Sequence, residues 1–120
     1  MPLTIKPLTS EDLPISIKNL NNQNVDKIDF LFKKVRNPSA DVIVKKTYTN
    51  STNQVEYDKT NEVYKVRLSV DDTGKFLDCM GTTVWLDIRP VMQGDRAIPM
   101  ELIPVKVTHT LYSRSDAGVS

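Results

Sequence analysis

The chain has 120 residues, with 16 basic side chains, 15 acidic side chains, one histidine and one cysteine. This length suits one domain that can bury a core without disulfides. A single cysteine excludes an intrachain disulfide framework and any multi-cysteine zinc site. A net charge of +1 excludes the strongly basic balance of a protein that binds duplex nucleic acid. No apolar run approaches the roughly 20 residues that span a bilayer, and no secretory signal is expected at the N-terminus.

β-Branched residues dominate the composition. There are 13 Val, 8 Ile and 11 Thr, against only 3 Ala and 4 Glu. β-Branched side chains are restricted at χ1 and fit a pleated, half-buried surface better than a helix. Long helices normally bring more Ala, Leu, Glu and Gln. The composition therefore predicts an all-β domain.

Residues 1–12 are predicted to form an extended N-terminal arm. Prolines interrupt this segment and remove backbone hydrogen-bond donors. Its apolar residues Leu3, Ile5 and Leu8 are too few to form a core of their own. Termini are usually poorly ordered unless something holds them, so an ordered apolar arm needs a partner surface. These three residues are therefore candidate interface residues.

Alternation of apolar and polar residues predicts about seven short strands along the rest of the chain. Turn-forming Asn, Pro, Gly and Asp residues separate them. The strands are expected at 13–18, 28–33, 40–48, 55–57, 63–70, 82–89 and 98–111. Short strands at regular spacing with turns between them are typical of a β-sandwich. We expect an immunoglobulin-like antiparallel β-sandwich over residues 13–112, followed by a small polar tail over 113–120.

Three local features interrupt the alternation. Pro90 is expected to end the strand before it or to place that strand at a sheet edge. The parity of the apolar positions switches at Ile103-Pro104, which predicts a bulge or a strand break there. After the fifth strand, Asp71 or Asp72 is expected to cap one helical turn.

The sequence contains no recognisable catalytic, metal-binding or cofactor-binding constellation. His109 has no sequence neighbour suited to act as its nucleophile or its orienting partner, so a structural or surface role is expected. Cys79 lacks the electropositive neighbours of a reactive thiol and is expected to be a small buried residue. Asp71, Asp72 and Asp78 lack the spaced ligands and the closing Glu of a calcium loop. We therefore predict no catalytic residue, no metal ligand and no cofactor.

Charged residues on the strands are expected to lie on solvated faces. Asp87 is expected to pair across strands with Arg89 or Arg67. Five basic residues lie on neighbouring predicted strands, namely Lys33, Lys34, Arg36, Lys45 and Lys46. Without interleaved exposed aromatic residues these are a weak signal for single-stranded nucleic acid, and no nucleic-acid partner is predicted.

Trp85 is a further candidate interface residue. It lies on the opposite parity to Val84, Leu86 and Ile88, so it faces outward if those three residues face the core. The alternative is that the parity is inverted and Trp85 is the core aromatic residue. An outward tryptophan is typical of a protein interface, whereas a sugar-stacking site would need further exposed aromatic residues.

Two neighbouring stretches resemble a pattern of small phage structural domains. The first, Tyr64–Leu77, is an alternating strand that ends at Ser69 and continues into acidic residues, a threonine and a short turn. The second, Gly81–Arg89, is a strand that carries a Trp-x-Asp-Ile motif from Trp85. On these stretches the chain resembles, over about residues 13–112, the immunoglobulin-like N-terminal domain of phage upper baseplate proteins and related tail and head-fibre proteins.

The resemblance implies a non-enzymatic bacteriophage virion structural protein. Such a protein would act as an adaptor or attachment module in the tail, baseplate or fibre, docked onto other virion structural proteins in a symmetric or homo-oligomeric assembly. It would be assembled in the cytoplasm of the bacterial host and would have no membrane partner. The first alternative is a head (capsid) decoration or head-fibre protein, and the second is a carbohydrate-binding adhesion module.

Overall fold

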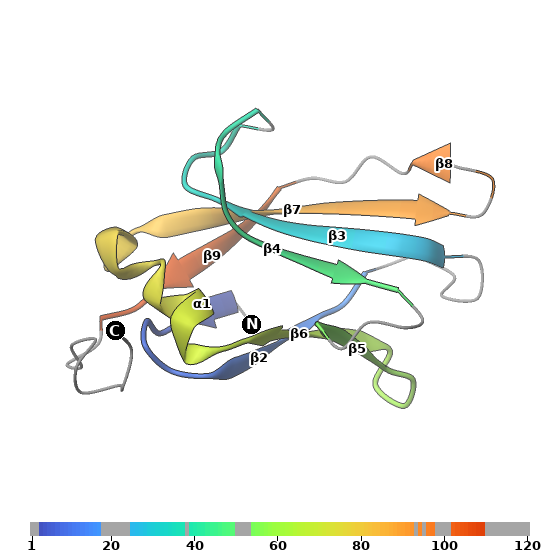
Figure 1. Ribbon diagram of the computed structural model, residues 1–120, viewed down its shortest axis with the longest axis horizontal. Helices are drawn as coiled ribbons and strands as arrows, with labels where there is room; N and C mark the ends of the chain where they lie inside the picture. Colours follow the sequence, from blue (N-terminus) through green and yellow to red (C-terminus); the bar gives the residue numbers. More distant parts are fainter. Residues whose placement is uncertain are drawn as a thin grey trace.

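In the computed structural model of the protein, two β-sheets pack face to face as a sandwich (Figure 1). The structure describes residues 3–17, 25–37, 39–49, 54–92, 94, 96–97 and 102–109. The larger sheet has the order β1 (Leu3–Ile5), β9 (Ile103–Val107), β7 (Thr83–Met92), β3 (Val25–Lys33) and β4 (Val42–Tyr48), with β8 (Arg96–Ala97) paired to β7. The smaller sheet has the order β2 (Glu11–Ile15), β6 (Val63–Leu68) and β5 (Val55–Asp58). The helix α1 (Val70–Gly74) and the 3-10 helix η2 (Leu77–Cys79) connect β6 to β7.

The all-β prediction is confirmed. Each of the seven expected strands has a counterpart, in β2 to β7 and in β9. The last of them, β9, begins at Ile103, where the parity switch predicted a break. The short strands β1 and β8 were not expected from the alternation, because three and two residues are too few to show a period of two.

The prediction for Pro90 is wrong. β7 continues through Pro90 to Met92, and Pro90 lies opposite Ile28 of β3 in the middle of the larger sheet. The described partners of β7 on its other side are β9, which pairs up to Leu86, and β8, which pairs from Val91. Pro90 falls between these two stretches, where a strand can do without a backbone donor.

The predicted N-terminal arm is also wrong for the residues that the structure describes. Leu3–Ile5 forms β1, which pairs in parallel with Val105–Val107 of β9. Ile5 is fully buried and Leu8 is 3% exposed. Three alternating residues are enough to bury one face at the end of an existing sheet, so the sandwich begins before residue 13. The predicted polar tail, 113–120, lies outside the described residues.

Thr73 of α1 holds the turn between β1 and β2 in place. Its Oγ1 donates a hydrogen bond to the carbonyl oxygen of Thr9 at 2.7 Å and accepts one from the Thr9 N–H at 3.1 Å. Thr73 is fully buried, and Leu8 beside this contact has a φ of +63°, a left-handed conformation that a branched side chain rarely adopts. The hydroxyl of Thr73 therefore supports a turn that is unfavourable in isolation.

Replacing Thr73 with valine is expected to lower the free energy of unfolding by about 1–3 kcal/mol, because the part-buried Thr9 N–H and carbonyl both lose their partner. Urea denaturation measures this loss, and faster hydrogen exchange at the Thr9 amide would locate it. Thr82→Val is a matched control, because the Thr82 hydroxyl bonds the Cys79 carbonyl at 2.6 Å on an exposed residue. An equal loss in both variants would contradict the role given to Thr73.

The helix α1 is capped by a residue other than those expected. Ser69 is the N-cap, and its Oγ accepts a hydrogen bond from the backbone N–H of Asp72. The Asp72 side chain in turn accepts a hydrogen bond from the Ser69 N–H, which completes a capping box. The helical turn is thus confirmed, while Asp72 acts from the third helical position.

No helix in the described part of the chain is long and apolar enough to cross a membrane.

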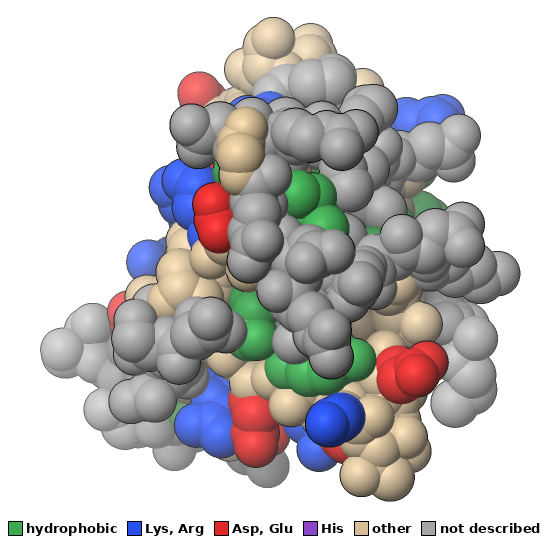
Figure 2. Space-filling view, turned by 90° about the vertical axis from the view of Figure 1, so that its right-hand side faces the viewer, with side chains coloured by type: hydrophobic (Ala, Val, Ile, Leu, Met, Phe, Trp, Pro, Cys, Tyr) green, Lys and Arg blue, Asp and Glu red, His purple; other side chains and the backbone are tan. Residues whose placement is uncertain are grey.

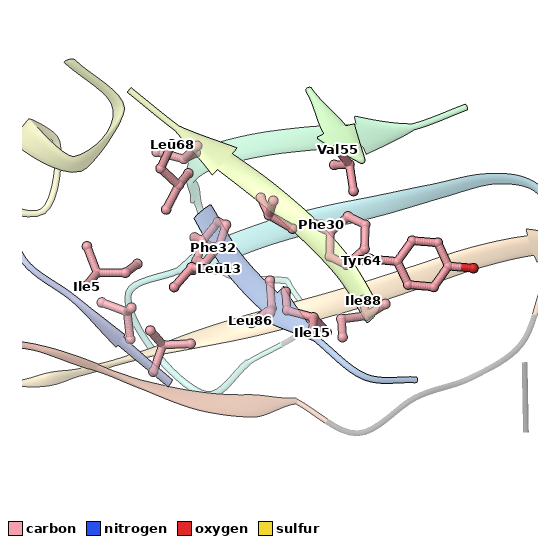
Figure 3. Packing of buried hydrophobic residues seen from close by; sticks show 14 of the residues in the cluster. Ile5, Leu13, Ile15, Phe30, Phe32, Val55, Tyr64, Leu68, Leu86 and Ile88 are labelled. Carbon is pink, nitrogen blue, oxygen red and sulfur yellow. The ribbon is translucent and has the colours of Figure 1, made fainter. Parts of the chain in front are cut away.

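The core fills the space between the two sheets (Figure 3). Phe30 and Phe32 of β3 are fully buried beside Leu86 and Ile88 of β7. The ring of Phe32 meets that of Phe76, which follows α1, edge to face at 5.8 Å between centroids. The alternation that predicted these strands therefore also identified the residues that bury the inner face of the larger sheet.

Three tyrosines close one end of the core. Tyr64 of β6 lies 5.1 Å from Tyr48 and 4.8 Å from Tyr57, measured between ring centroids. Tyr64 is 2% exposed, and its burial, together with the two neighbouring phenols, raises the pKa of Tyr64 well above its ordinary value. Tyr64 is therefore a neutral packing residue that joins the two sheets.

Candidate protein interface

The two large hydrophobic side chains that are exposed among the described residues flank one hairpin. Val35 is 54% exposed and Val42 is 45% exposed. Both lie in or next to the turn between β3 and β4, which rises from the larger sheet on the side away from the smaller sheet (Figure 1). Exposed apolar residues grouped at one place are typical of an interaction surface.

Trp85 faces outward, as its parity predicted. It lies opposite Lys33 of β3 and Pro104 of β9, while its neighbours Val84 and Leu86 are fully buried in the core. The side chain of Trp85 is only partly exposed. The guanidinium carbon of Arg36 lies 5.3 Å from the centre of the Trp85 ring, within the range of a cation–π contact.

Val42 of β4 and Trp85 of β7 both lie opposite Lys33 of β3, and Lys45 lies opposite Leu31 on the same face. Together with the turn residues Val35 and Arg36 they form one surface, which we call the hairpin surface. Its members are Val35, Arg36, Val42, Lys45 and Trp85. Tryptophan and arginine are enriched among the residues that dominate binding energy at interfaces. The position of Arg36 on the ring also keeps the indole of Trp85 oriented before any partner arrives, which reduces the entropy lost on binding.

A buried charge cluster lies next to Trp85 on the same face of the larger sheet. The Lys33 Nζ lies 2.8 Å from Oδ2 of Asp87, and the Arg89 guanidinium donates to the same oxygen at 2.8 and 3.0 Å. Lys33 is 2% exposed and Asp87 is 6% exposed. Burial alone would raise the pKa of Asp87, but the hydrogen bonds and charges of Lys33 and Arg89 outweigh it and lower that pKa.

The sequence had pointed to a different setting for Asp87. It was expected on a solvated face with Arg89 or Arg67 as its partner, and Arg89 is indeed a partner. Arg67 instead bonds Glu56 on the smaller sheet. The buried partner Lys33 was missed, because the register that places β3 beside β7 is not visible in the residues of either strand alone.

The other candidate interface residues lie elsewhere. Leu3 is partly buried and packs against the core, and Ile5 and Leu8 are buried within the same chain. They come from β1 and the turn after it, at the opposite end of the larger sheet from β4. Three of the four predicted interface residues are therefore structural, and Trp85 alone belongs to the hairpin surface.

The residues considered for chemistry do not come together. Cys79 is buried and reduced, as expected, and His109 is exposed beyond the end of β9 beside Gly81. In the ranges that the structure describes, no three His, Cys, Asp or Glu side chains are placed to hold a metal ion. Of the five residues considered, Asp72 completes the helix cap and Cys79 lies in the core, and the rest are exposed: Asp71, Asp78 and His109.

An open depression of about 540 Å³, lined mostly by polar and charged residues, lies between α1 and the smaller sheet. Its basic side chains are Lys46 and Arg67, and Lys46 bonds Asp72 at 2.8 Å. Burial alone would raise the pKa of Asp72, but its bonds to Lys46 and Ser69 lower it. The lining holds no aromatic ring: Ser10, Asp12, Lys46, Gln54, Arg67, Leu68, Ser69 and Asp72. Such a depression lacks the stacking platform that a sugar-binding site normally uses.

One end of the sandwich offers a comparison with the hairpin surface. Figure 2 views the end that lies on the right in Figure 1. The described side chains on this end include hydrophobic, basic and acidic residues that lie near one another. The hairpin surface is the candidate for binding a protein because it places the exposed Val35 and Val42 on one side of the sheet with Trp85.

Comparison with known proteins assigns no family. No protein-family model matches the chain, and no curated protein sequence matches it.

Proposed function

We propose that the chain is a non-enzymatic virion structural protein of a bacteriophage, which docks onto neighbouring virion proteins through the hairpin surface. The observation that carries this proposal is the grouping of the exposed Val35 and Val42 beside the stacked Trp85 and Arg36. A hydrophobic anchor with a cationic neighbour suits a protein partner better than a small polar ligand.

The strand order supports an immunoglobulin-like assignment. Such sandwiches place strands B, E and D in one sheet and C, F and G in the other, with a further strand C′ beside C in variable-type domains. Here the smaller sheet has the order β2-β6-β5, and the larger sheet contains β9-β7-β3-β4. Taken in chain order, these correspond to B-E-D and to G-F-C-C′. The strand β1 departs from the simplest pattern, because it pairs with β9 rather than in the smaller sheet.

The stretches that carry the phage resemblance have defined structural roles, and this supports the proposal. The stretch Tyr64–Leu77 contains most of β6, the Ser69 cap and α1. The stretch Gly81–Arg89 contains most of β7 and brings Trp85 and Asp87 to its outer side. In this interpretation the motif builds the rigid support on which the hairpin surface is presented.

A modest surface is sufficient if the virion repeats it. The tail, baseplate or fibre is the proposed location, and the partners are other virion structural proteins in a symmetric assembly. Many copies held side by side convert weak individual contacts into strong overall attachment.

The proposed function is tested by following the chain into particles. A tagged copy produced during infection by the phage that encodes the chain should co-sediment with purified virions, and gold labelling should mark the tail. Labelling of the head would place the protein as a head decoration instead. Full recovery of the chain in the particle-free fraction would overturn a virion role.

Replacing Trp85 with alanine is expected to lower the recovery of the chain in virions while leaving it folded. Val63→Ala is a matched control, because Val63 is a partly buried residue on the smaller sheet, away from the hairpin surface. Circular dichroism confirms folding in both variants. Equal incorporation of Trp85→Ala and wild type would contradict the role of the hairpin surface.

A further inference from the structure

The β3–β4 hairpin has a net positive charge that the rest of the chain lacks. Residues 25–49 contain six basic and three acidic side chains, a net charge of +3, whereas the whole chain has +1. Lys33 is paired with Asp87 and Lys46 with Asp72. Lys27 lies 3.8 Å from Asp29, and the other exposed bases of the hairpin are Lys34, Arg36 and Lys45. The hairpin therefore presents a positive field to a partner, while the rest of the chain is negative.

β4 is an edge strand of the larger sheet. In the described chain, β3 is its only strand partner. The backbone N–H of Thr47 donates a hydrogen bond to Oε1 of Gln54 at 2.9 Å, and Gln54 lies just before β5 in the smaller sheet. The Thr47 amide therefore points away from β3, toward the free side of β4. The side chain of Gln54 accepts its hydrogen bond and so covers the edge at Thr47.

The amide directions along β4 follow from this contact. In an antiparallel strand, alternate residues direct both their N–H and C=O to the same side. Lys45 is two residues from Thr47, so its backbone groups also face the edge. A register shift opposite Phe32 and Lys33 makes a bulge before this point. Within the described residues no strand pairs with β4 on this side, and the stretch of the edge before Thr47 runs over residues 42–45.

We propose that residues 42–45 of β4 accept an extended segment of a partner protein, whose side chains alternate between acidic and apolar residues. This inference deepens the proposed function by naming the chemistry of the partner. Backbone hydrogen bonds to Lys45 supply affinity, as in other cases of strand addition. An acidic side chain opposite Lys45 forms a favourable cross-strand pair on the outer face. Apolar side chains on the other face extend the contacts of the half-buried Ile43.

The same charges disfavour a second copy of this chain at the edge. Antiparallel pairing of two β4 strands would bring Lys45 and Lys46 of one copy near those of the other. Like charges directly opposite one another are destabilising, and lysines on an edge strand commonly prevent self-association. The charges at this edge therefore disfavour pairing with a second copy of the chain and favour pairing with an acidic segment of a partner protein.

The inference is tested with a synthetic peptide that alternates Glu and Val, added to the full chain. Binding is expected by calorimetry, with a shifted and exchange-protected Lys45 amide by NMR. Two control peptides alternate Lys and Val, or keep the Glu–Val sequence with N-methylated amides, and neither is expected to bind. Equal binding of the N-methylated peptide would overturn strand addition in favour of simple charge attraction.

Charge reversal at the edge gives the second measurement. Lys45→Glu is expected to weaken binding of the Glu–Val peptide roughly threefold to tenfold, since one exposed attraction is lost and one repulsion is gained. Lys106→Glu is the matched control, an exposed lysine on β9 of the same sheet, and should leave the affinity nearly unchanged. Equal weakening by both variants would overturn the assignment. If Lys45→Glu fails to fold, the N-methylated peptide still tests the edge in the wild-type chain.

Two further outcomes separate this inference from its rivals. Tighter binding of a single-stranded oligothymidine than of the Glu–Val peptide, with the same amides shifted, would overturn it in favour of a nucleic acid. Dimerisation of the chain through β4, seen by light scattering, would overturn it in favour of a second copy. A chain that enters virions without binding the peptide would refute only the edge inference, whereas a peptide-binding chain that stays out of virions would refute only the proposed function.

Discussion

Replacing Phe32 with alanine is expected to lower the free energy of unfolding by about 3–5 kcal/mol. Phe32 is fully buried in β3, and its ring meets Phe76 edge to face. The substitution removes apolar area from the core and leaves a cavity that the two sheets can close only in part. A domain of this size typically has a free energy of unfolding of about 5–15 kcal/mol. A cost of about 5 kcal/mol would therefore unfold a large fraction of the molecules if the wild type lies at the low end of that stability. Urea denaturation with a constant m-value measures the change.

Two variants show whether the loss comes from the core. Val42→Ala removes a side chain that is 45% exposed and should change stability by no more than about 0.5 kcal/mol. A double-mutant cycle with Phe32→Leu and Phe76→Leu should give a coupling of about 0.5–1.5 kcal/mol from the paired rings. A cost of less than about 1 kcal/mol for Phe32→Ala would contradict the packing described for β3.

The sandwich was predictable because its main strands bury one face each. Alternation with a period of two places Phe30 and Phe32 on the same side of β3 and Leu86 and Ile88 on the same side of β7. That signal requires several residues per strand. It failed for β1, where Leu3 and Ile5 are the only apolar positions and the prolines nearby suggested an arm.

The candidate interface was predictable only where it depends on local parity. The outward direction of Trp85 follows from the positions of Val84 and Leu86. The contact with Arg36 and the pairing of Lys33 with Asp87 depend on the register between β3 and β7. The register decides which residues of different strands lie side by side, and it cannot be read from the pattern of either strand alone. The same reason explains why the supporting charge cluster was expected on a solvated face.

Replacing Asp87 with leucine is expected to lower the free energy of unfolding by about 3–5 kcal/mol, because Lys33 then keeps its buried charge without its carboxylate partner. Glu56→Leu is the matched control, since the Arg67–Glu56 pair has side chains that are 52% and 59% exposed, and an exposed pair contributes at most about 1 kcal/mol. Thermal or urea denaturation compares the two. A loss for Asp87→Leu no larger than that of Glu56→Leu would show that the Lys33–Asp87 pair is effectively solvated.

The double variant Lys33→Met/Asp87→Leu separates charge from shape. It removes both buried charges and adds apolar side chains beside the buried Leu31, so it should recover most of the stability lost in the single variant. A double variant as unstable as Asp87→Leu would mean that shape, not charge, sets the cost.

The contribution of Asp87 to the stability of the wild type also depends on pH. Because the pKa of Asp87 is lowered on folding, its stabilising effect is complete above the unfolded value of about 3.9 and is lost as the pH falls through the lower folded value. The stability difference between wild type and Asp87→Leu should therefore be constant near neutral pH and shrink only below about pH 4.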